Sequence, residues 1–277
     1  MISITVEILL ISVFAGFIGS LLGLGGGIII TPALTLLLGI DIKYAIGASI
    51  VSVIATSSGS AIAYLRDKIT NVRAGMFLEI ATTTGALTGA VIAGVVSTRY
   101  LYLIFGFLLL YSAVNMFKKR NQELPQKFPE NPMSDKLKLN GSYYDKALGQ
   151  TVDYHVTGIY GGFGMMYAAG IISGLLGIGS GVFKVMAMDS FMKLPMKVST
   201  ATSNFMIGVT AAASAGIYLT RGNIDPKIAA PVALGVLLGA AVGTKVMQRL
   251  KSTTLRLVFI PVLLYVSVEM IMKGVKL

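Results

Sequence analysis

The sequence predicts an all-α polytopic membrane protein built from two homologous units. Of its 277 residues, 55% are hydrophobic and only 13% are charged, whereas about a quarter of a soluble domain is charged. Apolar stretches of about 20 residues recur along the chain, as transmembrane helices require. They lack the alternation of membrane-barrel strands, so helices are expected to pair the backbone inside the bilayer. The lipid bilayer is therefore a predicted partner.

The second observation behind this fold class is an internal repeat with an offset of 154 residues. Three separate matches share the offset, pairing residues 15–27 with 169–181, 43–49 with 197–203, and 109–111 with 263–265. A single offset held along the chain indicates duplication. We expect a first membrane repeat at 1–117, a linker at 118–155 and a second membrane repeat at 156–277.

A glycine spacing that occurs in both units adds a weaker match between them. Gly85 and Gly89 are paired here with Gly235 and Gly239, which requires a small deletion in the second unit. Glycines four residues apart are typical of helices that pack closely in membranes. We therefore expect these four glycines to serve packing.

Each unit is expected to contain a glycine-broken pair followed by three transmembrane helices. The predicted segments are 4–22, 28–40, 43–65, 72–97 and 100–117 in the first unit, and 157–176, 182–194, 197–219, 227–248 and 254–273 in the second. A segment of about 13 residues spans only about 20 Å of a hydrocarbon core about 30 Å thick. Each glycine cluster therefore predicts a break near mid-membrane, forming either a re-entrant hairpin or two abutting short helices.

The first segment is interpreted as a membrane helix, because Glu7 stands where a secretory signal would carry basic residues. The linker is the one polar stretch, and Pro125, Pro129 and Pro132 make its first half irregular. Residues 141–144 and 151–154 could pair as a small β-hairpin. A plain solvated cytoplasmic loop is the alternative.

Loop charges predict the topology. A re-entrant first pair in each unit puts most basic residues on one face, the expected cytoplasmic face: Arg66, Lys68, Arg73, Lys118, Lys119, Arg120, Lys193, Lys197, Lys245, Arg249, Lys251 and Arg256. The outer face keeps fewer: Lys43, Arg99, Arg221, Lys227, Lys273 and Lys276. This positive-inside pattern predicts inverted units with both termini outside. It also explains the net charge of +11 without a nucleic-acid partner.

Matched breaks in inverted units point to a transporter with its site at the repeat interface. A break frees backbone N–H groups at the start of the next half-helix, where the helix dipole favours an anion. The candidate substrate-binding residues of the breaks are Gly25, Gly26, Gly27, Gly179, Ser180 and Gly181. The alternative is that these small residues only permit close helix packing.

Lys184 is the most informative charge, because it lies in an apolar segment one turn after Gly181. Ionisable groups at membrane depth are costly and usually functional. A bound anion would compensate this lysine; the alternatives are an ion pair with Asp189 and snorkelling to the interface. Glu79, also in a predicted membrane segment, is a candidate for proton coupling. Pro32 is expected to bend the first short helix.

Small polar side chains near the breaks could donate hydrogen bonds to an oxyanion. The candidates are Thr31, Ser49, Thr202, Ser203 and Asn204. Such residues also serve plain helix packing in membranes. The repeat relates Ser49 to Ser203, so these two are the more informative members of the set.

At these residues the sequence resembles the TauE/SafE family, the sulfite or organosulfonate exporters. The first unit carries Gly19-x-x-x-Gly23-x-Gly25-Gly26-Gly27, then Pro32 and Ala45-x-Gly47-x-Ser49. The second carries Gly177-x-Gly179-x-Gly181-x-x-Lys184-Val185, then Pro195-x-Lys197-Val198-Ser199-Thr200-Ala201-Thr202-Ser203-Asn204-Phe205. The resemblance covers nearly the whole chain outside the linker. Ser180 stands where the family usually has glycine, and Met186 where it usually has proline.

This resemblance implies a multi-pass permease of the bacterial or archaeal inner membrane for sulfite, sulfoacetate or a related sulfur oxyanion or organosulfonate. A secondary transporter is the leading hypothesis, with an anion-selective channel or a permease for small carboxylates as alternatives. An enzyme is disfavoured, because cysteine is absent and His155 is the only histidine. No metal or other cofactor is predicted. The substrate, the direction of transport and a homo-oligomeric state are left open.

Overall fold

A computed structural model describes residues 2–118, 132–177, 179–250 and 252–276. The helices in these ranges are α1 (Ile2–Leu22), α2 (Gly27–Leu36), α3 (Ile42–Arg66), α4 (Val72–Ala93), α5 (Thr98–Lys118), α6 (Pro132–Lys136), α7 (Ile159–Leu176), α8 (Gly181–Met186), a π-helical turn η1 (Ala187–Phe191), α9 (Met196–Thr220), α10 (Pro226–Met247) and α11 (Ser252–Lys276). The strands are β1 (Gly141–Asp145) and β2 (Gln150–Tyr154). The first part of the expected linker, residues 119–131, lies outside the described residues.

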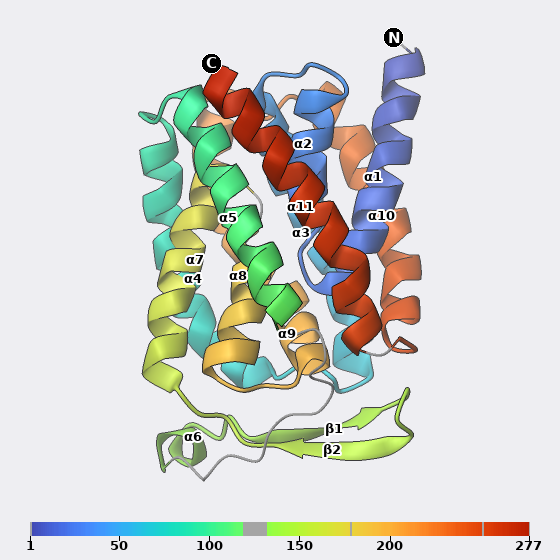
Figure 1. Cartoon of the computed structure of the whole chain (residues 1–277), viewed down its shortest axis with the longest axis vertical. Coiled ribbons are helices and arrows are strands. Elements are labelled where there is room, and N and C mark those ends of the chain that lie inside the picture. The colour runs from blue at the N-terminus through green and yellow to red at the C-terminus, as the bar shows by residue number, and fades with distance from the viewer. Residues whose placement is uncertain (1, 119–131, 178, 251, 277) are drawn as a thin grey trace.

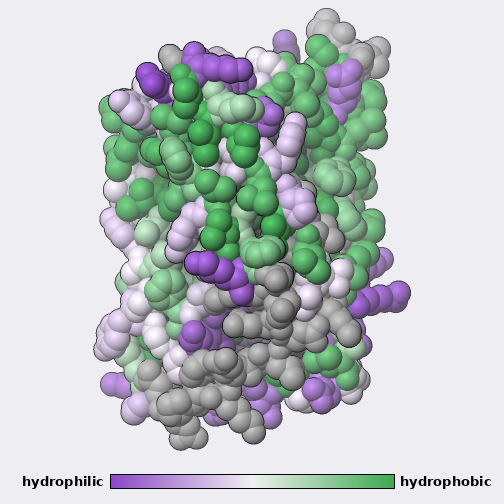
Figure 2. Space-filling view, in the orientation of Figure 1, coloured by the Kyte–Doolittle hydropathy of each residue, from purple (hydrophilic) through white to green (hydrophobic). Residues whose placement is uncertain are grey.

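The helical bundle has the apolar exterior of a membrane protein. Helices α1, α3, α4, α7 and α10 are long and apolar enough to cross a bilayer. Large hydrophobic side chains face outward from them, such as Ile62 at 72%, Ile80 at 62% and Leu238 at 62% exposure. Figure 2 shows hydrophobic residues over most of the middle of the visible face and hydrophilic ones toward its ends. The prediction of an all-α multi-pass membrane protein is confirmed.

Helices of the first unit pack against helices of the second unit, and equivalent pairs form when the two units are interchanged. Helix α1 packs along α10, and α7 packs along α4; α3 packs on α9, and α5 on α11. Helix α1 begins at the end of the bundle that carries both termini, whereas α7 begins beside the hairpin and runs the other way (Figure 1). Two hydrogen bonds are also related by the repeat. Tyr64 Oη donates to Ser20 O at 2.9 Å, and Tyr218 Oη donates to Gly174 O at 2.8 Å.

The packing corrects the pairing of the four glycines. A Cβ on Gly85 would collide with the backbone of Tyr167 on α7, and a Cβ on Gly239 would collide with that of Val13 on α1. Val13 and Tyr167 are themselves 154 residues apart. Gly85 therefore corresponds to Gly239 at the constant offset. The expected small deletion was wrong, because it matched glycines one helical turn out of register.

The short segments are shorter or less regular than expected. Helix α2 ends at Leu36 rather than near residue 40. Gly39 then adopts a positive φ of 66°, and the Asp41 side chain caps α3 by accepting from Lys43 N at 2.8 Å. In the second unit, α8 passes directly into the π-turn η1. Tight turns and caps thus redirect the chain before the apolar sequence ends.

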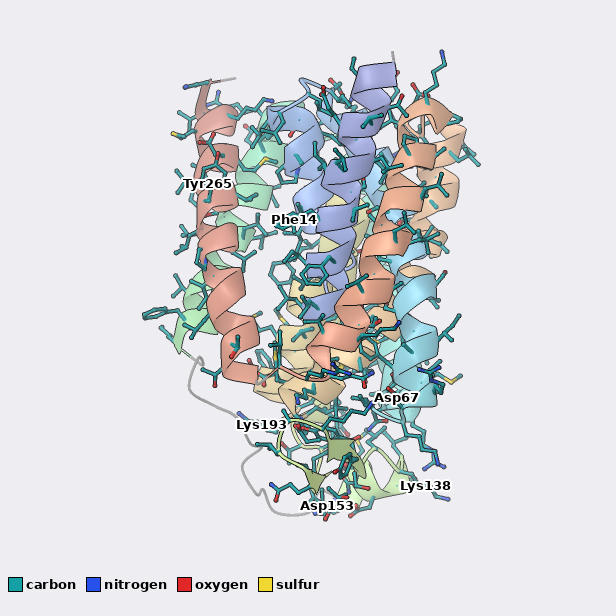
Figure 3. All side chains as sticks on the ribbon, turned by 90° about the vertical axis from the view of Figure 1, so that its right-hand side faces the viewer. Phe14, Asp67, Lys138, Asp153, Lys193 and Tyr265 are labelled. Carbon is teal, nitrogen blue, oxygen red and sulfur yellow. The ribbon has the colours of Figure 1, made fainter. Side chains whose placement is uncertain are left out.

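The hairpin lies across one end of the bundle (Figure 1). Gly141 pairs with Tyr154 and Asp145 with Gln150 in antiparallel register, where the sequence suggested that 141–144 and 151–154 could pair. Asp67, Lys138, Asp153 and Lys193 lie at this same end (Figure 3). The hairpin therefore covers the end of the bundle where several loop charges gather.

A buried ion pair fixes the hairpin to α9. Lys197 Nζ donates to Asp145 Oδ1 at 2.7 Å, and both side chains are only 4% exposed. Tyr143 Oη donates to the other carboxylate oxygen at 3.1 Å. Burial alone would raise the pKa of Asp145, but the hydrogen bond and charge of Lys197 outweigh it and hold the pKa below its ordinary value. The carboxylate therefore stays charged and bonded at neutral pH.

Candidate functional site

Both units interrupt their first helix with residues in left-handed backbone conformations. Gly25 and Gly26 have φ values of 78° and 74°, directly before α2. Gly179 and Ser180 have φ values of 66° and 49°, directly before α8. Glycine adopts this conformation freely, whereas a residue with a Cβ pays roughly 1–2 kcal/mol. Ser180 is therefore held in an unfavourable conformation by its surroundings.

The two breaks lie against each other through α3 and α9. A Cβ on either Gly25 or Gly179 would contact the same two side chains, Val53 of α3 and Ile207 of α9. A Cβ on Gly181 would collide with the backbone of Gly23 and Leu24 in the other break. The glycines thus allow the two interrupted backbones to approach without side chains between them.

The repeat-related serines join each break to the opposite unit. Ser49 Oγ of α3 donates to Gly177 O at 2.7 Å, and Ser203 Oγ of α9 donates to Gly23 O at 2.6 Å. Both residues are fully buried. These hydroxyl hydrogens already satisfy break carbonyls, which helix termini leave without intrahelical partners. In this conformation the two serines therefore support the breaks.

Lys184 lies at the centre of a buried polar cluster formed by three helices. Its side chain is fully buried, and its Nζ lies 3.7 Å from Glu79 Oε2 of α4. The same Nζ donates to Thr210 Oγ1 of α9. Thr210 Oγ1 in turn donates to Glu79 Oε1 at 2.6 Å, and Thr83 Oγ1 donates to that oxygen at 2.9 Å. The ion pair is therefore bridged by a hydroxyl.

The two charged residues of this cluster have no charged counterparts in the repeat. At the repeat offset, Lys184 corresponds to Ile30 and Glu79 to Ala233. A buried charge pair is expensive to desolvate and is weak evidence for stability. Glu79 Oε2 is buried without a hydrogen-bond partner in the described residues. The cluster thus places charges at positions that are apolar in the other unit.

Several other predicted residues are buried but lie in different surroundings. Thr202 Oγ1 accepts from Asn71 N at 3.0 Å, and Asn204 Nδ2 donates to Ser20 O at 3.1 Å. Within the described part of the chain, three side-chain atoms of the predicted substrate-binding residues are buried without a hydrogen-bond partner, in addition to Glu79 Oε2: Thr31 Oγ1, Ser180 Oγ and Asn204 Oδ1. Such atoms have capacity for a further polar contact.

Lys184 and Glu79 were predicted separately from the sequence, and Thr210 and Thr83 were not predicted. Thr210 lies seven residues after Ser203, which is two turns along the same helical face. Following the face of the repeated motif would have reached it. The ion pair considered between Lys184 and Asp189 is not the one formed, because Lys184 contacts Glu79 and Thr210.

Pro32 lies inside α2, where its ring removes a backbone donor. Its repeat-related residue, Met186, is the last residue of α8 before the π-turn. The two short helices therefore differ at this repeat-related position, because α2 carries a proline there whereas α8 gives way to a π-turn. A bend at Pro32 stays a prediction.

The chain is similar in sequence to known membrane transporter proteins. The model of a family described as sulfite exporter TauE/SafE matches residues 8–270. The probable membrane transporter protein YunE of Bacillus subtilis (strain 168) is 26% identical over 279 residues, covering 98% of each chain. The probable membrane transporter protein MJ0441 of Methanocaldococcus jannaschii is 24% identical over 271 residues, covering 92% of this chain and 91% of its own.

A further relative, the probable membrane transporter protein YdhB of Bacillus subtilis (strain 168), is 26% identical over 239 residues, covering 86% of this chain and 88% of its own. These names specify membrane transport without a substrate. No solved structure matches the chain.

Proposed function

Because the chain belongs to the sulfite exporter TauE/SafE family, we propose that it is a secondary transporter of a small sulfur oxyanion or organosulfonate, such as sulfite or sulfoacetate. The substrate sits between the two glycine-broken helix pairs. The observation that carries this proposal is Lys184, a fully buried cation on the short helix after the second break. Charges at membrane depth are retained where substrates or ions pass.

The two units act as an inverted repeat around this site. The exchanged helix pairs and the opposite directions of α1 and α7 support that relation. In transporters with inverted repeats, substrate sites form at the repeat interface beside discontinuous helices. Gly25 and Gly179 both lie close to Val53 and Ile207, which supports an interface centred between α3 and α9. Alternating access then rocks one unit against the other around this centre.

The substrate competes with Glu79 for Lys184. In the described conformation Glu79 is the ion-pair partner of Lys184: Glu79 Oε2 lies 3.7 Å from Lys184 Nζ, and the Thr210 hydroxyl bonds to both side chains. An arriving oxyanion replaces the carboxylate beside Nζ, and the hydroxyl of Thr210 is close enough to turn toward it. The unsatisfied Ser180 Oγ, one turn before Lys184, supplies a further polar contact. This exchange keeps the lysine paired at every step, because an unpaired buried charge is strongly unfavourable.

Glu79 also couples transport to protons. A carboxylate that the anion displaces from Lys184 is positioned at membrane depth, where ionisable groups serve as proton carriers. Anion binding and protonation of Glu79 then accompany each other. The linker hairpin lies on the cytoplasmic side, in accord with the basic residues gathered at that end. An inside-negative potential drives a monovalent anion that moves without a proton outward by about 2.3 kcal/mol per 100 mV, which favours export. An anion that moves with one proton carries no net charge, and its direction is set by the two concentration gradients alone.

Anion-induced thermal stabilisation of the purified protein tests this site. Sulfite, sulfoacetate and acetate are added to the natural chain, to Glu79→Gln and to the double variant Lys184→Met/Glu79→Met. The matched control, Lys197→Met/Asp145→Asn, also loses a buried lysine and its carboxylate partner, but at the hairpin. We expect a sulfur oxyanion to stabilise the natural chain and the control, to stabilise Glu79→Gln more, and to leave the double variant unchanged.

The outcomes separate substrate class from site. Stabilisation by acetate alone assigns the site to carboxylates and overturns the sulfur oxyanion. An equal shift in the natural chain and the Lys184→Met/Glu79→Met variant removes Lys184 from the site. No shift with any anion contradicts the proposal as a whole.

A further inference from the structure

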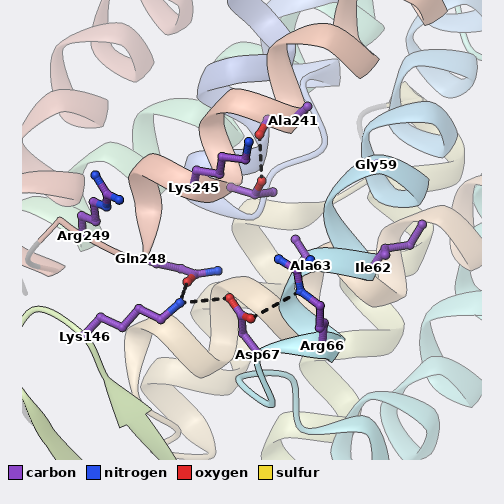
Figure 4. A pocket seen from close by; sticks show the side chains of 11 residues that line it. Gly59, Ile62, Ala63, Arg66, Asp67, Lys146, Ala241, Lys245, Gln248 and Arg249 are labelled. Carbon is purple, nitrogen blue, oxygen red and sulfur yellow. Dashed lines mark hydrogen bonds and ion pairs between the residues drawn. The ribbon is translucent and has the colours of Figure 1, made fainter.

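A second charged feature lies at the hairpin end of the bundle, away from Lys184. A groove with a cavity volume of about 420 Å³ runs between the last turns of α3 and α10, and the hairpin closes one side of it (Figure 4). The groove is lined by four cations and one anion: Arg66, Lys146, Lys245, Arg249 and Asp67. It therefore carries a net positive charge.

The single carboxylate does not neutralise this groove. Asp67 accepts from Lys146 Nζ at 3.1 Å and lies 3.7 Å from Arg66 Nε, whose side chain is 79% exposed. Within the described residues, Lys245 and Arg249 form no ion pair, and both are exposed. Two cations are thus fully available, and a third is only weakly held.

The opposite part of the groove is apolar and belongs to the membrane-facing surface. Gly59, Ala63 and Ala241 line it together with Ile62, which is 72% exposed. These residues precede Arg66 on α3 and Lys245 on α10, so the groove changes from apolar to basic toward the hairpin. A phospholipid at a membrane surface likewise changes from an apolar acyl chain to a negative headgroup toward the water.

We propose that this groove binds an anionic phospholipid, with its phosphate between Lys245, Arg249 and Arg66 and its acyl chain along Ile62. Basic pockets between membrane helices recognise such headgroups by charge. The phosphate also brings a negative charge to Lys146, which already bonds to Gln248, the residue directly after α10. The lipid thereby ties the hairpin to the ends of α3 and α10. Free phosphate shares the headgroup chemistry but leaves the apolar part of the groove empty.

The test measures the melting temperature of the detergent-purified protein with phosphatidylglycerol, phosphatidylcholine or inorganic phosphate. Lys245→Gln/Arg249→Gln removes two groove cations. The control, Arg99→Gln/Lys227→Gln, removes two exposed cations elsewhere. We expect phosphatidylglycerol alone to stabilise the natural chain and the control, with at least half of the shift lost in the groove variant. Arg66→Gln/Lys245→Gln is a second groove variant should the first fold poorly without lipid.

Equal stabilisation of the groove variants and the control by phosphatidylglycerol overturns the proposal. Equal stabilisation by phosphatidylcholine shows that the charge is not recognised and also overturns it. A full shift with inorganic phosphate assigns the cations to a free anion and excludes the lipid as occupant.

Discussion

At the scale of single residues, Lys184 and Glu79 form a charge pair that the packing of the bundle does not require. Their repeat-related residues, Ile30 and Ala233, are apolar. An apolar pair can therefore fill equivalent positions in the same fold. Because apolar residues occupy the equivalent positions, the charges of Lys184 and Glu79 are better explained by anion binding than by stability.

We predict that removing one charge destabilises the protein and removing both does not. Lys184→Met leaves Glu79 buried without its cation, which costs about 3–5 kcal/mol. Lys184→Met/Glu79→Met removes that penalty and is expected to unfold close to the natural chain. Denaturation of the purified variants measures this difference. A double variant as unstable as the single one would show that the cluster is mainly structural.

Much of this site could be predicted from residue type but not from position. Lys184 and Glu79 stand out as charges in apolar segments, yet they belong to different units. Only the packing of α4 against α9 and of α8 against α9 brings them together. Ser49 and Ser203 were identified through the repeat, but their hydrogen bonds to Gly177 and Gly23 depend on how the breaks meet.

At the scale of elements, close helix packing depends on particular glycines. We predict that Gly239→Ala destabilises the protein, because its Cβ would collide with the Val13 carbonyl of α1. Gly216→Ala is the matched control within α9, where a Cβ meets nothing within 4 Å. The control gains up to about 1 kcal/mol of helix propensity. A lower melting temperature for Gly239→Ala and a higher one for Gly216→Ala would confirm the prediction. Equal changes in the two variants would contradict it.

The hairpin supplies a prediction about pH. Because the pKa of Asp145 is lowered below 3.8 in the folded chain, its bond to Lys197 contributes stability above that value. The contribution is lost as pH falls through the lower folded pKa. Tyr144→Trp adds the only tryptophan, whose fluorescence is expected to stay constant down to about pH 4 and change below it.

The control for this measurement uses a second carboxylate of the same hairpin. Asp145→Asn in the tryptophan variant is expected to show altered fluorescence already at neutral pH. Asp153→Asn, an exposed hairpin position, is expected to leave the profile unchanged. If Asp145→Asn also has no effect, the ion pair does not hold the hairpin.

The order and approximate bounds of the membrane helices followed from hydrophobic length and the glycine clusters. The end of α2 at Leu36 did not, because the apolar sequence continues beyond it and Gly39 and Asp41 redirect the chain. The π-turn after Met186 was also beyond prediction. It begins directly after the residue that corresponds to Pro32, and no local sequence signal indicates it.

At the scale of the whole molecule, symmetric packing surrounds an asymmetric charge. In the proposed inverted topology, the hairpin and most basic loops lie on one side of the membrane. The chain contains no cysteine, so single introduced cysteines report their side directly. We predict that Asp153→Cys is labelled only from the cytoplasm and Lys227→Cys only from outside. Labelling of both from the same side would contradict the inverted topology.

Counterflow of labelled sulfite in proteoliposomes tests the central claim, carriage of a sulfur oxyanion at Lys184, most directly. Vesicles loaded with unlabelled sulfite are diluted into labelled sulfite. Carrier exchange predicts a transient internal accumulation above equilibrium with the natural chain and none with Lys184→Met/Glu79→Met. The control Lys197→Met/Asp145→Asn is expected to keep the accumulation. Flux without accumulation would indicate a channel, and accumulation retained in the Lys184→Met/Glu79→Met variant would contradict the site.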